Sequence, residues 1–437
     1  MKTSNYNLFF KHKDKFIGYN TLYNTFLIID NQAFPLLLKG MRNLLSFASA
    51  CKNTFQLLQD KKFIIDNDVD EIAIAKSVLY QTNYDNSKFR ITINPTLNCN
   101  FHCWYCYETH AEGTKITVET KERILKFIKH TIDINASLKH LYLDWFGGEP
   151  LLYFKDVVSP ILLETKKYAE AKGIEFISGF TTNGYLLTDD ILDFCILYSA
   201  KNFQITLDGH KERHNQVRFT HSGSNTYDKI VHNIKSAIIK GANVNVRLNI
   251  SSDTKADVVA ILNSFKGLEE QQLMNLHFSI HEVWQEREKV GGEIENILNL
   301  IRYYGFNANI YETSPHGISN TCYADKENEA VINYDGSIFK CTARNFLKEN
   351  SEGYLTEDGK IEWNSHYEKR KATSVFNYPE CHQCSIMPIC NAGCSQQQLE
   401  HPEHFCMHSF SKVKKMNFAK KVVLERLYRL EETRALV

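Results

Sequence analysis

The sequence has no excess charge of either sign, because 51 lysines and arginines balance 51 aspartates and glutamates among 437 residues. Without a basic surplus, neither a nucleic-acid partner nor an anionic membrane surface is indicated. The chain also lacks any stretch near the roughly 18 apolar residues of a membrane span. Its start, MKTSNYNLFFKHKDK, has no apolar core followed by small residues, so no signal peptide is predicted. We therefore expect a cytoplasmic protein.

Cysteine is the residue type that stands out. Of 12 cysteines, three fall within residues 99–106 and seven within residues 322–406. A cytoplasmic chain keeps its thiols reduced, so tight clusters indicate metal binding rather than disulfides. The other two have ordinary interpretations: Cys195 lies in an apolar helical segment and is expected in the core, whereas Cys51 begins a polar stretch.

The rest of the composition is that of a globular protein, with 43% hydrophobic and 23% charged residues. Six β-rich segments alternate with helix-period segments in the middle of the chain. These segments are residues 89–96, 141–146, 174–180, 203–207, 243–250 and 276–283. Strands joined by helical crossovers predict a parallel α/β sheet, expected here as a partial (β/α)6 barrel of the TIM type. In such barrels, chemistry gathers in loops after the carboxyl ends of the strands.

The two ends of the chain differ from this middle part. The first 85 residues are predicted to form short strands followed by helices, with one helix expected over residues 33–48. This order fits a small winged-helix-like module, and it fits a structural cap on the barrel equally well. After about residue 310, short strands, turns and cysteines precede a terminal helix. We predict three domains, over residues 1–87, 88–285 and 286–437.

The first cysteine cluster has the spacing C-x3-C-x2-C, at Cys99, Cys103 and Cys106. Three thiolates this close can hold an iron–sulfur cube by three of its irons. The fourth iron then keeps the open position that a catalytic metal site needs. A zinc site with a distant fourth ligand, such as His102 or His110, is the alternative.

Other candidate residues follow the later strands. Phe146-Gly147-Gly148-Glu149-Pro150 follows the second strand, Thr181-Thr182-Asn183-Gly184 the third, and Thr206-Leu207-Asp208-Gly209 the fourth, with Arg218 shortly after. Adjacent glycines let a ligand approach the backbone, and arginine suits a carboxylate. Each motif is also an ordinary turn sequence. Their shared position at strand ends favours a common site.

Over residues 88–285 the sequence resembles the radical S-adenosylmethionine (radical SAM) enzymes, on Cys99, Cys103, Cys106 and the GGEP segment at 147–150. The resemblance implies a [4Fe–4S] cluster whose open iron binds SAM. One electron would cleave SAM to methionine and a 5′-deoxyadenosyl radical, which removes a hydrogen atom from the substrate. The cofactor would carry this chemistry, and the protein would position it.

The resemblance also implies roles for single residues. Tyr105 would lie against the adenine, and Gly147, Gly148 and Glu149 would meet the methionyl amino group. Thr206 and Arg218 match the positions that hold the ribose and the carboxylate. Further candidates for the polar wall of the site are Thr182, Asn183 and Asn249. For Thr182, Asn183 and Asp208, turn formation is the competing interpretation.

The second cysteine cluster resembles the SPASM extension of radical SAM enzymes, on Gly336-x4-Cys341 and on the C-x2-C-x5-C-x3-C run over 381–394. From spacing alone, zinc ribbons are an equal alternative. The resemblance implies two auxiliary [4Fe–4S] clusters, hence three in all. Auxiliary cluster I would be held by Cys322, Cys341 and Cys394. Auxiliary cluster II would be held by Cys381, Cys384, Cys390 and Cys406.

Auxiliary cluster I lacks one ligand in this assignment. Some members carry an extra cysteine shortly before the first one, but residues 314–321 contain no thiol. The cluster would then keep an open iron able to bind a substrate thiolate, unless His316 closes it.

Enzymes with this extension mostly modify peptides or proteins. We expect a maturase of ribosomally made peptides (a RiPP maturase) that installs a crosslink, with a thioether favoured. Its partners would be a precursor peptide, whose leader binds the N-terminal module, and an electron donor such as flavodoxin or ferredoxin. The alternatives are an anaerobic sulfatase-type formylglycine maturase and a non-catalytic, cluster-bearing relative. Thr342 counts against the sulfatase branch, which has an aspartate base there.

Overall fold

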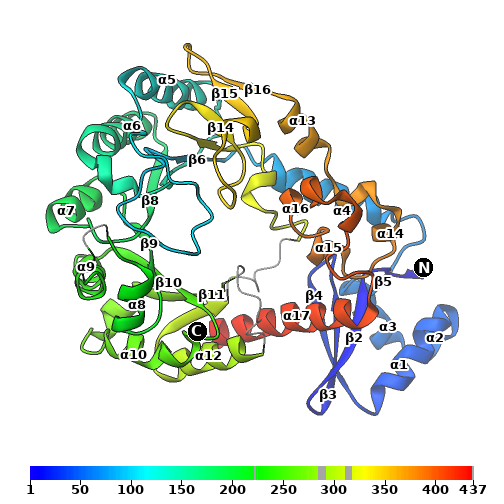
Figure 1. Ribbon diagram of the computed structural model, residues 1–437. Helices are drawn as coiled ribbons and strands as arrows, with labels where there is room; N and C mark the ends of the chain where they lie inside the picture. Colours follow the sequence, from blue (N-terminus) through cyan, green and yellow to red (C-terminus); the bar gives the residue numbers. More distant parts are fainter. Residues whose placement is uncertain (221–222, 224, 284–291, 311–316, 436–437) are drawn as a thin grey trace. The chain divides into compact units, whose positions relative to one another are not determined.

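The computed structural model describes residues 1–220, 223, 225–283, 292–310 and 317–435 (Figure 1). The chain forms two compact units. The first unit contains residues 1–84, 313–327 and 369–437, and the second contains residues 85–312 and 328–368. The residues expected as a third domain are therefore divided between the two units. The division into three functional domains stays a prediction.

The second unit is built on a parallel sheet whose strands pair in chain order. Its central strands are β6 (Lys88–Ile93), β7 (His140–Trp145), β8 (Glu175–Thr182), β9 (Asn202–Leu207), β10 (Asn243–Ile250) and β11 (Leu276–Glu282). Each pairs in parallel with the next. All six predicted strands are present, and the predicted partial barrel is confirmed.

The sheet continues beyond these six strands. β12 (Asn307–Ile310) pairs in parallel with β11, and β13 (Glu329–Ile332) pairs in parallel with β6. β14 (Ser337–Phe339), β15 (Gly353–Leu355) and β16 (Ile361–Trp363) then add antiparallel strands. Within the described residues, the sheet has eleven strands in an open order from β12 to β16.

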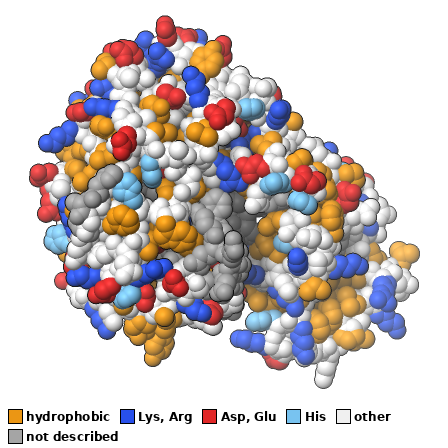
Figure 2. Space-filling view, in the orientation of Figure 1, with side chains coloured by type: hydrophobic (Ala, Val, Ile, Leu, Met, Phe, Trp, Pro, Cys, Tyr) orange, Lys and Arg blue, Asp and Glu red, His pale blue; other side chains and the backbone are white. Residues whose placement is uncertain are grey.

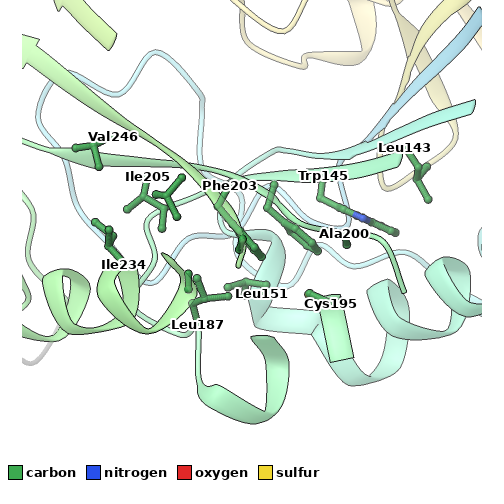
Figure 3. Packing of buried hydrophobic residues seen from close by; sticks show 14 of the residues in the cluster. Leu143, Trp145, Leu151, Leu187, Cys195, Ala200, Phe203, Ile205, Ile234 and Val246 are labelled. Atoms are coloured by element: carbon green, nitrogen blue, oxygen red, sulfur yellow. The ribbon is translucent and has the colours of Figure 1, made fainter. Parts of the chain in front are cut away.

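Helices cover one face of this sheet. They include α5 (Val118–Ile134), α6 (Ser159–Ala171), α7 (Asp189–Leu197), α9 (Tyr227–Ile239) and α12 (Glu293–Tyr303). Alternate strand residues point toward them, since successive side chains of a strand face opposite sides. Figure 3 shows Trp145 and Phe203 among the side chains that face Leu187, Cys195 and Ile234. Cys195 is fully buried, so its predicted place in the core is confirmed.

The opposite face of the sheet is polar. Arg90 on β6 forms an ion pair with Asp144 on β7, and Asn245 on β10 donates to Gln204 on β9 at 3.3 Å. A closed barrel would fill this side with branched apolar residues. The polar lining instead suits a polar ligand that enters the open sheet.

The first unit begins with an antiparallel sheet of β2 (Asn7–His12), β3 (Lys15–Asn20) and β4 (Thr25–Asp30). Next come α1 (Ala33–Arg42), α2 (Leu44–Ala50), α3 (Lys52–Asp60) and α4 (Glu71–Asn83), while β1 (Lys2–Thr3) pairs with β5 (Ile64–Ile65). The single helix predicted over residues 33–48 is wrong. Asn43 leaves the helical conformation, and its side chain accepts a hydrogen bond from the N–H of Ser46, as an N-cap does.

The start and the end of the chain share a core in this unit. Leu8, Phe10 and Ile17 of the three-stranded sheet pack against Ala419 and Val422 of α17 (Lys412–Ala435). The other face of the sheet packs on α1, where Phe16 stacks on Phe34 with ring centroids 3.8 Å apart. Both faces of the sheet are therefore covered by packed side chains. Within the described residues, its edge strands β2 and β4 have no further strand paired to them.

The surface charges and the hydropathy of the helices agree with the balanced composition of the sequence. Figure 2 shows basic and acidic side chains interspersed over the visible face. Among the described residues, no helix is long and apolar enough to cross a membrane.

Candidate active site

The loop after β6 carries the first three cysteines. Its backbone turns sharply, because the N–H of Cys106 donates to the carbonyl of Cys103 at 3.1 Å. The N–H of His102 donates to the carbonyl of Phe219 at 3.0 Å, which fastens the loop to a segment that follows β9. Cys99, Cys103 and Cys106 are all partly buried. The structure therefore presents the three thiols on one fixed loop at the carboxyl end of β6.

The electrostatics of these thiols fit a cationic cofactor. Burial raises the pKa of Cys99 and of Cys103, and it raises the pKa of Cys106 to about 11. Such thiols become thiolates when a bound metal supplies positive charge. In the described part of the chain, no three His, Cys, Asp or Glu side chains converge as ligands of a single metal ion.

The two glycines after β7 lie against the cysteine loop. Gly147 and Gly148 have φ angles of 76° and 49°. A Cβ on Gly147 would lie 2.6 Å from the Asn94 side chain, and one on Gly148 would lie 2.1 Å from the Asn98 carbonyl oxygen. The N–H of Glu149 donates to that same carbonyl at 2.9 Å. Two strand-end loops are thus held together where no side chain fits.

Replacing Gly148 with alanine should displace the cysteine loop, because the new methyl group would meet the backbone of Asn98. We expect SAM cleavage to fall about 100-fold, since a displacement near 1 Å can cost that much. The rate of 5′-deoxyadenosine formation measures the effect. Gly173→Ala is the control, because Gly173 also has a positive φ, of 71°, but no atom within 4 Å of the added Cβ. Equal losses in both variants would contradict the argument.

Glu149 is fully buried and braces the neighbouring loop. Its Oε1 accepts from the N–H of Leu151 at 3.0 Å and from Oγ1 of Thr182 at 2.7 Å, and its Oε2 accepts from the N–H of Asn183 at 2.8 Å. Burial raises the pKa of Glu149, and these hydrogen bonds oppose the rise. This carboxylate therefore positions the loops that surround the cysteines.

Thr182 and Asn183 take part in both a turn and the site. Oγ1 of Thr182 accepts from the N–H of Gly184 at 3.1 Å, as turn residues do. Nδ2 of Asn183 donates to Oδ1 of Asn100 at 2.8 Å and lies 3.9 Å from Sγ of Cys99. The two interpretations left open by the sequence are therefore compatible.

Tyr105, Asp208 and Arg218 form one buried network. The hydroxyl of Tyr105 donates to Oδ2 of Asp208. Nη1 of Arg218 donates to that hydroxyl at 2.6 Å and lies 3.5 Å from Oδ2 of Asp208. Asp208 and Arg218 are only 2% and 7% exposed. Among the residues that the structure describes, Nε of Arg218 and Oδ1 of Asp208 have no hydrogen-bond partner, so this network retains polar atoms for a ligand.

Further polar residues support Asp208. Its backbone N–H donates to Nδ1 of the fully buried His214 at 3.3 Å. Burial lowers the pKa of His214, and its Nδ1 is the acceptor of this hydrogen bond. Asn249 hydrogen-bonds to Asp208 and accepts from Nε of Arg247 at 2.9 Å. Thr206 pairs with Arg247 across β9 and β10. Asn249 thus lies at the Asp208 carboxylate, and the strand register places Thr206 beside Arg247.

A second group of cysteines gathers in the first unit, around α14 (Pro379–His382) and α15 (Met387–Cys390). Cys384 and Cys406 both lie close enough to Cys381 and to Cys390 to add to the rise in pKa that burial causes in those two thiols, and Cys381 acts on Cys390 in the same way. Burial raises the pKa of Cys381 to about 11 and that of Cys390 to about 12. These are the four residues predicted to hold auxiliary cluster II, and the structure brings them together.

The backbone around these thiols is shaped to meet them. The N–H of Phe410 donates to Sγ of Cys406 at 3.2 Å, and that of Ala392 donates to Cys390. Ala392 and Phe410 both have positive φ angles, of 54° and 59°, which non-glycine residues rarely adopt. Such backbone strain persists only where the surrounding structure fixes it, often at ligand sites.

The remaining three cysteines are placed in different units. Cys322 and Cys394 belong to the first unit, and Cys341 belongs to the second. Their joint role as ligands of auxiliary cluster I stays a prediction. His316, the alternative ligand, lies outside the described residues.

Two residues of the site were missed from the sequence. Glu108 accepts a hydrogen bond from the N–H of Gly148 at 2.9 Å, and burial raises its pKa to about 7. Burial raises the pKa of Tyr107, and the nearby Glu108, Cys106 and Cys341 add to the rise. Their position directly after Cys106 is the only signal that the sequence offers for them.

Comparison with known proteins agrees with this geometry. Residues 93–265 match the family model of the radical SAM superfamily. The chain is 25% identical over 337 residues to the cysteine-type anaerobic sulfatase-maturating enzyme of Clostridium novyi, covering 69% of this chain and 86% of that protein. It is 24% identical over 332 residues to the radical SAM cyclopropyl synthase TigE of Paramaledivibacter caminithermalis, and this match covers 68% of this chain and 65% of TigE.

Solved structures share the fold. The sulfatase-maturating enzyme anSMEcpe with bound AdoMet superposes with a TM-score of 0.57 at 19% identity, covering 78% of this chain and 99% of that one. SuiB of Streptococcus suis, bound to its precursor peptide SuiA, superposes with a TM-score of 0.54 at 16% identity. This match covers 93% of this chain and 99% of SuiB. The predicted relationship to sulfatase maturases and to RiPP maturases is confirmed.

Proposed function

We propose that this radical SAM enzyme is a maturase that installs a crosslink, with a thioether favoured, in a ribosomally made precursor peptide. The observation that carries the proposal is the three-cysteine loop after β6, held against Gly147 and Gly148 and adjoining the Tyr105–Asp208–Arg218 network. Superfamily membership implies a [4Fe–4S] cluster and SAM at this loop. Bound there, SAM would supply the 5′-deoxyadenosyl radical that removes a hydrogen atom from the peptide.

The protein's own residues would bind and orient SAM. Cys99, Cys103 and Cys106 would hold the cluster by three irons. The left-handed backbone at Gly147 and Gly148 lets the cysteine loop approach closely, and this backbone together with Glu149 would meet the methionyl amino group. The unpartnered Nε of Arg218 would reach the carboxylate of SAM.

The N-terminal sheet supports a peptide as substrate. Both faces of this sheet are packed, and within the described residues β4 pairs only with β3. An extended leader peptide can add to such an edge through backbone hydrogen bonds. Ile28 on β4 is 71% exposed and offers an apolar contact beside that edge. The extent of the structural match supports the same substrate class. The fold of SuiB, a structure solved with a precursor peptide, extends over 93% of this chain, whereas that of anSMEcpe extends over 78%.

Replacing Ile28 with aspartate should weaken leader binding about tenfold, since burying a contact of this size contributes 1.5 kcal/mol or more. The affinity for a candidate precursor peptide, chosen from small open reading frames next to the gene and measured by fluorescence anisotropy, tests the expectation. Leu45→Asp is the control, because Leu45 on α2 is 87% exposed. Deleting residues 1–85 is less informative, since those residues share a core with α17. Equal affinities for wild type and Ile28→Asp would end the leader-binding hypothesis.

A formylglycine maturase is the second candidate, favoured by the match to the Clostridium novyi enzyme over 86% of its length. Thr342 stands where that branch has its aspartate base, and a hydroxyl is a far weaker base than a carboxylate. This difference, together with the N-terminal sheet, ranks the peptide maturase first.

One experiment separates the candidates. The enzyme is co-expressed with a candidate precursor peptide from a small open reading frame next to the gene, and the peptide is then examined by mass spectrometry. Separately, the purified enzyme is reconstituted anaerobically with iron and sulfide and is assayed for SAM cleavage. A crosslink appears as the loss of a pair of hydrogens between two linked residues. Formylglycine in a sulfatase peptide would reverse the ranking. Absence of 5′-deoxyadenosine with SAM and dithionite would overturn both.

A further inference from the structure

A small exposed patch lies at the beginning of α17. Its apolar centre consists of Met407, Phe410 and Val413, which are 53%, 52% and 70% exposed. Its rim is basic, because residues 407–421 contain five lysines and no acidic residue. Lys412 and Lys414 are both exposed. In a chain with zero net charge, such a segment is a local excess of positive charge.

The patch adjoins the four-cysteine group of the first unit. The N–H of Phe410 donates to Sγ of Cys406, at 3.2 Å, while the Phe410 ring is half exposed. Nζ of Lys415 lies 5.7 Å from the centre of that ring, and Lys415 hydrogen-bonds to Cys384. Cys406 is itself partly exposed, so this predicted cluster ligand lies close to solvent beside Phe410.

The four thiols suit electron entry better than substrate chemistry. Four thiolates saturate the irons of a [4Fe–4S] cluster, so no iron is left for a substrate. Lys415 and the backbone N–H groups beside the sulfurs favour the reduced, more negative state of such a cluster. A cluster close to the surface shortens the path from a donor.

We propose that the patch of Met407, Phe410 and Val413, with its lysine rim, is the docking surface for an acidic, one-electron donor protein. The inference rests on the proposed function, whose chemistry consumes one electron per SAM. The donor is oxidised by one electron, and the carbon–sulfur bond of SAM breaks to give methionine and the 5′-deoxyadenosyl radical. The donor is thus a reduced iron–sulfur or flavin protein with carboxylates around its cofactor.

The size and charge of the patch fit this kind of partner. Electron-transfer encounters are weak and use small interfaces, below about 1,200 Å². Lysines around an apolar centre steer an acidic partner toward the site and let it leave quickly. An unscreened basic rim also makes association depend on salt, because the Debye length is about 8 Å at 0.15 M.

The test compares two charge-reversed double variants of the reconstituted full-length enzyme. Lys412→Glu with Lys414→Glu changes the rim, and Lys167→Glu with Lys201→Glu changes two exposed lysines of the second unit. The probes are a purified ferredoxin and a purified flavodoxin. Binding is measured by titration, and 5′-deoxyadenosine formation is measured with each reduced donor and, separately, with dithionite.

We expect the rim variant to bind at least one donor about tenfold more weakly at low ionic strength and to lose a similar factor in donor-driven turnover. The difference should shrink at 0.5 M salt, and the rate with dithionite should stay within twofold. Donor binding and donor-driven rates unchanged by Lys412→Glu with Lys414→Glu would overturn the docking surface. Binding of these lysines to phosphatidylserine vesicles, with neither donor bound, would overturn it as well. Failure of the dithionite reaction in the wild-type enzyme would instead refute the proposed function.

Discussion

Replacing Cys103 with alanine should abolish SAM cleavage and remove about four irons per chain, while the four-cysteine group of the other unit keeps its metal. In the proposed site the three thiols would hold different corners of one cluster, and the loop that carries them is fixed by backbone hydrogen bonds. Loss of one ligand leaves two thiolates, too few to retain a cluster against exchange into solution. Iron and sulfide analysis together with 5′-deoxyadenosine formation measures the result, which we expect to be a drop of at least about 1,000-fold, the scale of removing a whole catalytic unit.

Cys195→Ala is the matched control for this variant. Cys195 lies in the same unit and is fully buried in the core between the sheet and the helices (Figure 3). It is not one of the predicted cluster ligands. Its removal should cost about 1 kcal/mol of stability through a small cavity. Iron content and SAM cleavage should remain those of the wild type. Zinc in place of iron in protein isolated without oxygen would contradict the cluster assignment altogether.

The sequence was sufficient to predict the barrel strands because their signal is local. β7 and β9 alternate between buried and less buried residues, and the apolar set, such as Leu141, Leu143 and Trp145 on β7, forms the core. The cysteine spacing and the Gly147-Gly148 pair are likewise local patterns with specific chemical requirements. Local signals of this kind need no knowledge of distant partners.

Other features depend on partners far away in the chain. β13 has only four residues, and it becomes part of the sheet by pairing with β6, which lies more than 200 positions earlier. Asp208 looked like a turn residue, and its role follows from Tyr105 and Arg218, which different loops bring to it. The packing of the N-terminal sheet against α17 is also a contact between the two ends of the chain. No periodicity within a segment could have indicated these contacts.

Replacing Arg218 with glutamine should destabilise the enzyme and weaken SAM binding at the same time. The variant would leave Asp208 buried without its cation, and breaking a buried ion pair on one side costs about 3–5 kcal/mol. It also removes the unpartnered Nε that we assign to the SAM carboxylate. We expect the dissociation constant of SAM to rise about 100-fold, which corresponds to roughly 2.7 kcal/mol. Calorimetric titration with SAM and thermal unfolding under anaerobic conditions measure the two effects.

The pH dependence of this loss follows from Asp208. Burial already raises the pKa of Asp208, and Arg218 opposes that rise, so removing Arg218 raises the pKa further. A carboxyl whose folded-state pKa exceeds its unfolded value destabilises the fold above the folded-state pKa and ceases to do so as pH falls through it. The deficit of Arg218→Gln relative to wild type should therefore begin to shrink as the pH falls below the raised pKa of Asp208, which thermal unfolding over a pH series measures.

The double variant Arg218→Gln with Asp208→Asn separates the structural role from the binding role. Without the carboxylate, no uncompensated charge remains, so the double variant should regain most of the stability and lose the pH dependence. SAM affinity should stay low, because the guanidinium is still missing. Recovery of both properties would show that Arg218 serves Asp208 alone and that SAM is held by other residues. Recovery of neither would show that the hydroxyl of Tyr105 needs a charged partner, since it is the remaining member of the network.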